Sequence, residues 1–409
     1  MSVRLPHRPS VWFLISSYHP TVGGGETHAR LLARELAARG WPITILTRRR
    51  ERTWPARESM DGTTIRRVGC SGAPRLGKYL MLLPALACLL RHRREIDVLY
   101  VCGLRVLGLT GMAFALLTRR PVVLRSEACG ELSGDFIFSS PHRAAVRAPR
   151  LVRALIACRN RLYRRADRFL AISRVIRDEF LACGVPASRI AQIPNGIETD
   201  AFPAADATTR ARLRAELGLP AESFLFAYSG KLNRGKGLEM LIRAWSRVHA
   251  ARREAHLVLI GAGGQQFLSC EDALRREAEQ CNLIDAITFT GYVTRVADYL
   301  RACDAFVFPS ENEAFGLALL EALSCGLPAL ASATGGILDI VEDGVNGRLL
   351  PVGDATAWAD AMLELMGTTD ARRKWGEAGR RTVLDRFSIK SVAASHETLF
   401  QALARPRTA

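Results

Sequence analysis

Two glutamates at a fixed spacing are the strongest chemical signal in this sequence. Glu313 and Glu321 stand with seven residues between them, where a turn leads into a leucine-rich helical segment. A carboxylate among leucines is costly to bury unless it is hydrogen-bonded, and the hydroxyl groups of a ligand would provide such bonds. For Glu313 another explanation stays open, because an acidic residue ahead of a helix also stabilises the helix N-terminus.

A basic, glycine-rich loop suits a diphosphate. Residues 229–237 contain Lys231, Arg234 and Lys236 together with three glycines. Two of the five lysines of the whole chain lie in this one loop. The spacing does not match GxxxxGK[ST], which disfavours a P-loop ATPase. A solvated basic turn is the alternative interpretation.

Two further glycine clusters lie between an expected strand and an expected helix. They are Gly23–Gly25, followed by Glu26, and the pair Gly335 and Gly336. Glycines let the backbone approach an anion closely, and a helix N-terminus offers free N–H groups and the positive end of its dipole. Glycines at such places also simply permit tight packing, so neither cluster is decisive by itself.

The elements that must position these residues follow an α/β pattern. Short apolar segments alternate with longer amphipathic ones, which is typical of repeated βα units and a parallel sheet. The clearest helix spans residues 26–39, a polar stretch at 195–220 is expected to be the hinge between two such arrays, and residues 371–404 form a final helical segment. Two doubly wound domains normally bind ligand at the carboxyl ends of their strands, so a cleft between them is the expected site. Strands are expected at residues 11–16, 43–47, 98–102, 122–125 and 168–173. After residues 190–194 the pattern restarts, with strands expected at 224–229, 256–260, 287–290, 305–309 and 328–332.

Charge is distributed unevenly along the 409 residues, whose net charge is +17. Residues 1–200 hold 33 Lys/Arg and 15 Asp/Glu, whereas residues 201–409 hold 24 and 25. A basic half indicates a polyanionic partner, which could be nucleic acid, an anionic membrane surface or a phosphorylated substrate. Arginine used only as a solubilising residue is the plainer explanation.

The cysteines and the apolar segments indicate the cellular compartment in which the chain is expected. Ten cysteines are scattered without a CxxC pair, which indicates free thiols and signals neither a zinc site nor a disulfide framework. The longest uncharged apolar segments, 79–90 and 106–118, fall short of the ~18 to 20 residues that a spanning helix needs. No segment has the features of a secretory signal, so we expect a cytoplasmic protein.

The order of these motifs resembles the retaining glycosyltransferases of family 4, also called glycosyl transferases group 1, which have the GT-B fold. That resemblance implies two doubly wound Rossmann-like domains facing across a cleft. Residues 1–198 would bind the acceptor, residues 199–385 would bind the nucleotide sugar, and a C-terminal helix in residues 386–409 would pack back toward the N-terminal domain. The matching motifs are GGGE at 23–26, GK…KG at 230–237, E-x7-E with its EAFG core at 313–321, the late glycine pair at 335–336 and PNGIE at 194–198.

The resemblance also implies roles for individual residues. Glu313 would contact hydroxyls of the donor sugar, and Glu321 would accept hydrogen bonds from the ribose. Lys236 matches a phosphate-binding lysine, and Lys231 stands where an arginine is usual. Two cations and two helix ends would then meet the charge of the leaving group, so we expect no metal ion and no cofactor apart from the donor substrate. The donor-binding residues expected are Gly23, Gly24, Gly25, Lys231, Lys236, Glu313, Ala314, Phe315, Gly316, Glu321, Gly335 and Gly336.

One departure from the family concerns the segment after the strand at 122–125. Many members have a histidine there, and this chain reads Arg125-Ser126-Glu127. Glu127 or Ser126 is expected to take its place, where it would polarise a hydroxyl or position the acceptor. We count Glu127 with Glu313, Lys231 and Lys236 as the catalytic residues. A structural role for Glu127 is the alternative. His28, on the first helix, is expected to be a packing residue.

The expected function is transfer of a sugar from a nucleotide-diphosphate donor to a hydroxyl of a glycan or lipid-linked acceptor, in cell-surface polysaccharide or glycolipid biosynthesis. Arginines and apolar residues alternate between Arg143 and Arg168, which suits the inner face of an anionic membrane; a solvated helix packed on the sheet is the alternative. A nucleotide-sugar epimerase on the same fold is a second possibility for the function. A nucleic-acid-binding protein is a third, although no recognition motif supports it, and we expect no nucleic-acid partner.

Overall fold

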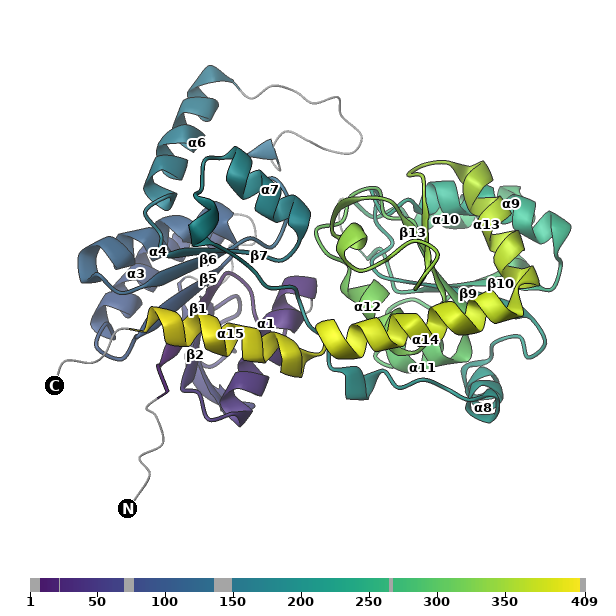
Figure 1. Cartoon of the computed structure of the whole chain (residues 1–409), viewed down its shortest axis with the longest axis horizontal. Helices are drawn as coiled ribbons and strands as arrows, with labels where there is room; N and C mark the ends of the chain where they lie inside the picture. Colours follow the sequence, from purple (N-terminus) through teal and green to yellow (C-terminus); the bar gives the residue numbers. More distant parts are fainter. Residues whose placement is uncertain (1–7, 22, 70–76, 136–148, 265–267, 405–409) are drawn as a thin grey trace, which may run out of the picture. The chain divides into compact units, whose positions relative to one another are not determined.

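The computed structural model describes residues 8–21, 23–69, 77–135, 149–264 and 268–404, and it divides into two compact units (Figure 1). Unit 1 comprises Met1–Gly196 and Ile389–Ala409, and unit 2 comprises Ile197–Ser388. The sequence places these boundaries after residues 198 and 385. Each unit is a largely parallel sheet covered by helices, so the predicted α/β class with two doubly wound domains is confirmed.

Unit 1 is built on an eight-stranded sheet of order β3-β4-β2-β1-β5-β6-β7-β8, in which the β3–β4 pair is antiparallel and the other neighbours are parallel. Its strands are β1 (Val11–Ile15), β2 (Ile43–Arg48), β3 (Arg57–Met60), β4 (Thr63–Val68), β5 (Val98–Cys102), β6 (Val122–Arg125), β7 (Arg168–Ala171) and β8 (Ile190–Gln192). Its helices are α1 (Gly24–Ala38), α2 (Gly77–Leu80), α3 (Leu82–Arg91), α4 (Leu104–Thr118), α6 (Arg150–Tyr163), α7 (Arg174–Ala182) and α15 (Ile389–Leu403).

The central strand β1 shows why both faces of this sheet are covered. The Trp12 ring lies 5.4 Å from the ring of His92, which follows α3, and Phe13 lies 6.5 Å from Phe400 of α15. Successive side chains of a strand point to opposite faces, and a strand buried on both faces needs helices on both sides. Figure 1 shows α15 lying beside α1, where Glu397 of α15 accepts a hydrogen bond from Trp41 Nε1 over 2.6 Å.

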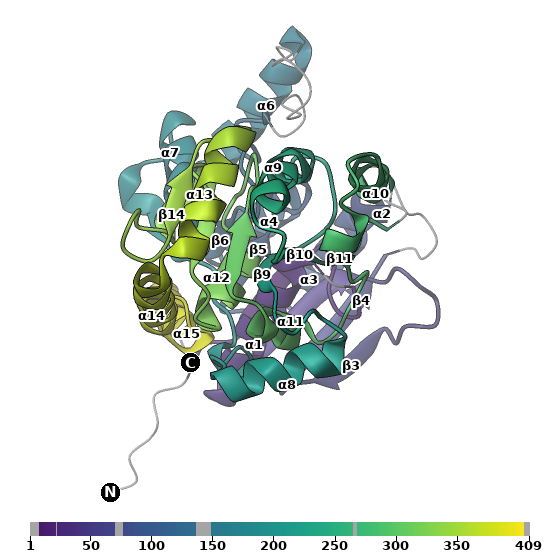
Figure 2. The ribbon, with the colours of Figure 1, turned by 90° about the vertical axis from the view of Figure 1, so that its right-hand side faces the viewer.

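Unit 2 contains a six-stranded parallel sheet of order β11-β10-β9-β12-β13-β14. Helices cover both faces, with α9, α10 and α13 on one side and α11, α12 and α14 on the other (Figures 1 and 2). The strands are β9 (Phe224–Ser229), β10 (Ala255–Ile260), β11 (Ile287–Phe289), β12 (Ala305–Phe308), β13 (Ala329–Ser332) and β14 (Arg348–Leu350). The helices are α8 (Ala207–Leu217), α9 (Leu238–Ala251), α10 (Glu271–Gln280), α11 (Val296–Ala302), α12 (Leu317–Ser324), α13 (Ala355–Gly367) and α14 (Thr369–Arg386).

Four strands are present where the sequence pattern predicts none. β3 and β4 form a hairpin through Asp61 and Gly62, which have φ of 52° and 75°. Positive φ at both central residues is the requirement of a tight hairpin turn, and Asp-Gly is a favoured sequence for it. Each strand of this edge hairpin carries two adjacent charged residues, so it lacks the apolar character of a buried strand. The other two missed strands, β8 and β14, have only three residues each.

The predicted hinge at 195–220 is wrong in its extent. The boundary falls after Gly196, and α8 lies inside the stretch that was expected to be a linker. Asp206 caps α8 by accepting a hydrogen bond from the Thr209 N–H over 2.7 Å. Arg214 of α8 is buried and pairs with Asp304, which ties the helix to unit 2.

The single helical segment predicted at 371–404 is two helices, α14 and α15. They are interrupted at Phe387 and Ser388, and the Phe387 ring packs edge-on against Phe315 at 5.8 Å. That contact fixes the chain to unit 2 before α15 begins in unit 1. No helix in the described ranges is long and apolar enough to cross a membrane.

Candidate functional site

The carboxyl ends of β9 and β12 are the switch point of the unit 2 sheet. From β9 the chain adds β10 and β11 on one side, and it then returns to add β12, β13 and β14 on the other. Open α/β sheets bind ligands in the crevice at such a point. The loops that follow these two strands, residues 230–237 and 309–316, carry Lys231, Lys236 and Glu313.

An ion pair joins the two loops. Lys236 Nζ donates to Glu313 Oε2 over 2.8 Å, and the two side chains are 31% and 16% exposed. The Glu311 N–H also donates to the Gly235 carbonyl over 3.0 Å. Gly237 has φ of 69° and lies against the Pro309 carbonyl, so a side chain at Gly237 would collide with that backbone. The structure therefore brings Lys236 and Glu313 together at the edge where a ligand is expected.

Glu313 does not cap α12, which answers the alternative left open by the sequence. The N-cap residue of α12 is Gly316, with φ of 114°, and no side chain donates or accepts a capping hydrogen bond there. The carboxylate of Glu313 is directed to Lys236 instead.

Glu321 lies on α12 and is half-buried. Desolvation by burial raises the pKa of its carboxyl group to about 7. Its side chain makes no hydrogen bond or ion pair with the residues that the structure describes. A desolvated acceptor without a donor is unfavourable, and a ligand hydroxyl would satisfy it.

The sequence predicts that Gly335 and Gly336 open an α-helix. They open a five-residue 3-10 turn instead, Gly335–Asp339. Gly335 has φ of 54°, and side chains at either position would collide with the backbone at Glu313 and Ala314. The Gly336 N–H donates to the Glu313 carbonyl over 2.8 Å. These glycines thus allow the turn to pack on the Glu313 loop, and one of the N–H groups expected to face an anion is already used.

The other donor-binding candidates of unit 2 differ in exposure. Lys231 is exposed, and its side chain contacts no partner among the described residues. The Lys231 carbonyl accepts a hydrogen bond from Tyr228 over 3.1 Å, which fixes the loop backbone. Phe315 is 2% exposed and packs on Phe387, so its side chain serves the core, while Ala314 packs through its backbone on Gly336.

In unit 1, two carboxylates stand over the first turn of α1. Gly23 is the N-cap residue, and a side chain there would collide with the carboxylate of Glu26. A Cβ on Gly25 would lie 3.0 Å from Glu127 Oε1. The positive end of the helix dipole favours these acidic groups. The diphosphate contact expected for Gly23–Gly25 stays a prediction.

Glu127 is held by a buried guanidinium. Arg125 is 1% exposed; its Nη1 donates to Glu127 Oε1 over 3.0 Å and its Nη2 donates to Asn195 Oδ1 over 2.7 Å. Burial raises the pKa of Glu127, Arg125 opposes this shift, and the nearby charge of Glu26 adds to it. The sequence pattern gave Arg125 and Asn195 no role. The missed signal is a charged residue within a buried strand, which requires a partner.

Two neighbouring side chains have structural functions. Glu131 Oε2 accepts a hydrogen bond from the Leu104 N–H at the start of α4 over 2.8 Å, and burial raises the pKa of this carboxyl group to about 7. His28 is a buried packing residue, as predicted, and its Nδ1 accepts a hydrogen bond from the Gly196 N–H over 3.2 Å. Burial lowers the pKa of His28 well below its usual value.

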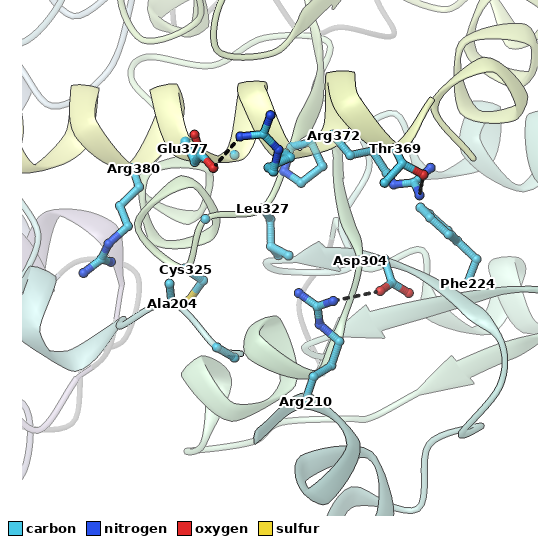
Figure 3. Close-up of a pocket in the computed structure, with 15 residues that line it drawn as sticks. Ala204, Arg210, Phe224, Asp304, Cys325, Leu327, Thr369, Arg372, Glu377 and Arg380 are labelled. Carbon is cyan, nitrogen blue, oxygen red and sulfur yellow. Dashed lines mark hydrogen bonds and ion pairs between the residues drawn. The ribbon is translucent and has the colours of Figure 1, made fainter. Parts of the chain in front are cut away.

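A separate pocket of about 440 Å³ lies at the amino ends of the unit 2 strands, away from the carboxyl ends that lead to Lys236 and Glu313 (Figure 3). It is lined at the amino ends of β9 and β12 by Phe224 and Asp304, and Arg210 pairs with Asp304 at 3.5 Å. It contains none of the residues predicted to act in catalysis or donor binding. Within the described residues, no group of three or more His, Cys, Asp or Glu side chains is arranged to hold a metal ion.

Comparisons with known proteins match both units. Residues 22–201 match the family described as Glycosyltransferase Family 4, and residues 209–382 match Glycosyl transferases group 1. A D-inositol 3-phosphate glycosyltransferase of Xylanimonas cellulosilytica is 37% identical over 52% of this chain and 51% of that protein. An N-acetyl-alpha-D-glucosaminyl L-malate synthase of Bacillus anthracis is 26% identical over 58% and 59%. The chain thus spans between half and three fifths of the length of these two relatives.

A solved structure with the same fold is that of Anabaena HepE in complex with UDP and glucose. Its TM-score is 0.76 at 20% identity, and the match covers 97% of this chain and 100% of that one. The two family matches lie one in each array, and their ranges contain the glycine, lysine and glutamate motifs of both arrays. This chain therefore belongs to the GT-B glycosyltransferases, with a family 4 region in its first half and a group 1 region in its second.

Proposed function

We propose that the chain is a retaining, metal-independent glycosyltransferase, which moves a sugar from a nucleotide-diphosphate donor to a hydroxyl group of an acceptor. The observation that carries this proposal is the Lys236–Glu313 pair at the switch point of unit 2, followed on α12 by the unpartnered carboxyl of Glu321. A sugar nucleotide offers diphosphate oxygens to the lysine and hydroxyl donors to the carboxylates.

The donor is assigned to unit 2. Glu313 accepts hydrogen bonds from hydroxyls of the transferred sugar, and Glu321 accepts them from the ribose. UDP is the first nucleotide to test, because the HepE structure, which shares this fold, contains UDP and glucose.

The cations of the loop after β9 support departure of the nucleoside diphosphate. As the bond from the anomeric carbon to the phosphate oxygen breaks, its electron pair stays on the diphosphate. The acceptor oxygen bonds to that carbon, and the hydroxyl proton passes to the departing diphosphate. Lys236 and Lys231 stabilise the developing negative charge, which is the role that a metal ion has in other transferases. Glu127 accepts a hydrogen bond from the acceptor hydroxyl and orients it.

The acceptor is proposed to be a small hydroxylated anion. The two relatives are named for inositol 3-phosphate and for malate, and both compounds carry hydroxyl groups and negative charge. These names do not support the cell-surface polysaccharide or glycolipid pathway that was expected from the sequence. The basic character of the first half, +18 over residues 1–200, suits an anionic acceptor as well as it suits a membrane.

Helix α6 supports association of unit 1 with an anionic membrane surface. Leu151 and Leu155 are 72% and 63% exposed, and Arg150 and Arg153 are exposed beside them. Figure 1 shows α6 projecting from the sheet of unit 1. Apolar side chains flanked by arginines are the pattern of a helix that lies at a lipid interface. Arg143 and Arg147 of the predicted stretch lie outside the described residues.

The proposal is tested by incubating the full chain with UDP-glucose or UDP-N-acetylglucosamine and either inositol 3-phosphate or malate. NMR should show an acceptor glycoside with the anomeric configuration of the donor, formed equally well in EDTA. An inverted product would exclude the retaining mechanism, and loss of turnover in EDTA would exclude metal independence. A change in the sugar of the donor when no acceptor is present would favour the epimerase. Salt-sensitive binding of DNA or RNA without any sugar transfer would favour the nucleic-acid alternative.

A further inference from the structure

Arg48, at the carboxyl end of β2, is a buried guanidinium without a counter-ion. It is 8% exposed, and its Nε is buried with no hydrogen-bond partner. Its side chain makes no hydrogen bond or ion pair with any residue in the described part of the chain. A buried, unpaired charge is strongly unfavourable, because the desolvation cost is not offset by an attraction.

The other buried arginines all have a carboxylate partner, so the unpaired guanidinium of Arg48 is an exception. Four arginines are buried among the described residues. Arg67 pairs with Glu58, Arg125 with Glu127 and Arg214 with Asp304. Arg48 alone has no carboxylate, so its partner has to come from outside the described structure.

A glycine packs against the Arg48 guanidinium, and a second cation lies near it. A Cβ on Gly77 would lie 2.6 Å from Arg48 Nη1 and 2.9 Å from its Cζ, so the glycine leaves room for the guanidinium. Burial lowers the pKa of Arg48, and the charge of nearby Arg50 lowers it further. Arg50 is exposed, and its Nη1 donates to Thr21 Oγ1 over 3.2 Å in the segment between β1 and α1. Arg48 and Arg50 are neighbouring cations, and together they add positive potential at this edge.

This edge is also where the acceptor of a glycosyltransferase is expected within unit 1. β2 lies next to β1, and β5 lies on the other side of β1 at the switch point of the sheet. Ligands of such sheets bind outside the carboxyl ends of the strands. The segment that Arg50 contacts continues into the glycine turn, against which Glu127 lies.

We propose that Arg48 and Arg50 bind the anionic group of the acceptor, a phosphate monoester or a carboxylate. This inference rests on the proposed function and specifies its acceptor class. A guanidinium fork matches the paired oxygens of either group. The group supplies the counter-charge that Arg48 lacks, and it orients the acceptor so that its hydroxyl faces Glu127.

Binding to the full chain, measured by calorimetry, tests this site apart from turnover. The probes are inositol 3-phosphate, malate, uncharged inositol, inorganic phosphate and, separately, UDP. We expect wild type to bind at least one of the organic anions and not inositol, and the preference between the first two distinguishes a phosphate site from a carboxylate site. Arg48→Gln should weaken that binding at least tenfold and Arg50→Gln at least threefold, with UDP affinity unchanged. Arg48→Lys should be intermediate, because it keeps the charge and loses the fork.

Controls separate binding from structure. Arg57→Gln, on the exposed edge strand β3, removes the same charge and should leave anion binding unchanged. Because Arg48 is unpaired, Arg48→Gln should not lower the melting temperature in the absence of anion, whereas loss of a structural arginine would lower it. Equal anion binding by wild type and both glutamine variants would overturn the proposal, and so would a wild type that binds UDP but none of the anions. Anion binding that depends on Arg48 without UDP binding would support this site and reject the donor assignment.

Discussion

Lys236 Nζ and Glu313 Oε2 lie 2.8 Å apart and join the loop after β9 to the loop after β12. The two residues are far apart in the chain, and they meet because β12 returns to pair with β9 after β10 and β11 have been added on the other side. The pair has two consequences. The lysine holds the carboxylate in place, and the carboxylate holds the ammonium group where a diphosphate would approach.

Glu313→Gln should lower kcat by about a hundredfold while changing the Kd for UDP less than threefold, because the amide keeps the shape and loses the charge that strengthens the hydrogen bonds of the transition state. Lys236→Gln should instead raise the Kd for UDP at least tenfold, since it removes a charge-assisted contact to phosphate. Steady-state kinetics and calorimetry with UDP measure these two effects. Glu377→Gln, which breaks the exposed Arg373–Glu377 pair on α14, is the matched control and should change neither value. Wild-type kcat in Glu313→Gln would remove Glu313 from the mechanism.

Glu321 should make both stability and nucleotide binding depend on pH. Burial raises the pKa of this carboxyl group to about 7 in the folded chain, whereas an unfolded glutamate has a pKa of about 4.3. The contribution of protonated Glu321 to the free energy of unfolding is therefore fully present below about pH 4.3, and it is lost as the pH rises through 7. Between pH 5 and pH 8 wild type should lose roughly 1 to 2 kcal/mol more than Glu321→Gln, a value that allows for partial exposure of the side chain. Urea unfolding at both pH values measures the difference.

Nucleotide binding should have the opposite pH dependence at Glu321. A ribose hydroxyl donates to the ionised carboxylate, so UDP affinity should increase as the pH rises through 7. Glu321→Ala should weaken UDP binding at pH 8 at least tenfold, and Glu321→Gln should abolish the pH dependence. Glu131 has a pKa raised to about 7 as well but lies in unit 1, so Glu131→Gln serves as the control that leaves the UDP profile unchanged. An identical UDP profile in wild type and Glu321→Gln would show that the ribose does not contact Glu321.

The sequence predicted best the strands whose apolar residues form uninterrupted runs. Val98–Cys102, Val122–Arg125 and Phe224–Ser229 were predicted residue for residue, because turn residues end each run on both sides. The β3–β4 hairpin was missed because its exposed edge strand, Arg57–Met60, is short and mostly polar. Its Asp61-Gly62 turn was the available signal.

The residues of the candidate site could be predicted from local sequence, whereas the contacts between them could not. Glu313, Lys236 and Glu321 could be chosen from their motifs, since their residue types and spacing are local properties. Their pairing could not be predicted, because the Lys236–Glu313 contact depends on the order of the strands in the sheet. Arg125 and Arg48 were missed for a related reason: whether a buried arginine has a partner depends on residues from other strands. Asn195, for example, reaches Arg125 from the end of unit 1.

Glu127 should control the acceptor step through its charge. Glu127→Gln keeps an oxygen that can accept from Arg125, so the fold should persist, while kcat/KM for the acceptor falls at least tenfold and UDP affinity is unchanged. Burial raises the pKa of Glu127, and the nearby charge of Glu26 adds to that shift. Glu26→Gln should therefore lower that pKa and move the acid limb of the kcat/KM profile to lower pH. If the acid limb stays in place in Glu26→Gln, a group other than Glu127 is responsible for it.

Helix α6 should bind unit 1 to anionic vesicles through its exposed leucines and arginines. Each leucine that enters the interface contributes its apolar area, and each arginine near an anionic surface contributes about 1 kcal/mol. Sedimentation with vesicles of phosphatidylglycerol and phosphatidylcholine should show binding at low salt and release at high salt, since screening weakens the electrostatic part. The double variants Leu151→Gln/Leu155→Gln and Arg150→Gln/Arg153→Gln should each reduce the bound fraction at least fivefold. Leu181→Gln/Leu384→Gln, which changes two leucines that are 41% exposed on other helices, should bind like wild type. Equal vesicle binding by wild type and all these variants would assign the membrane contact to another surface. A wild-type chain that stays in solution at low salt would exclude membrane binding.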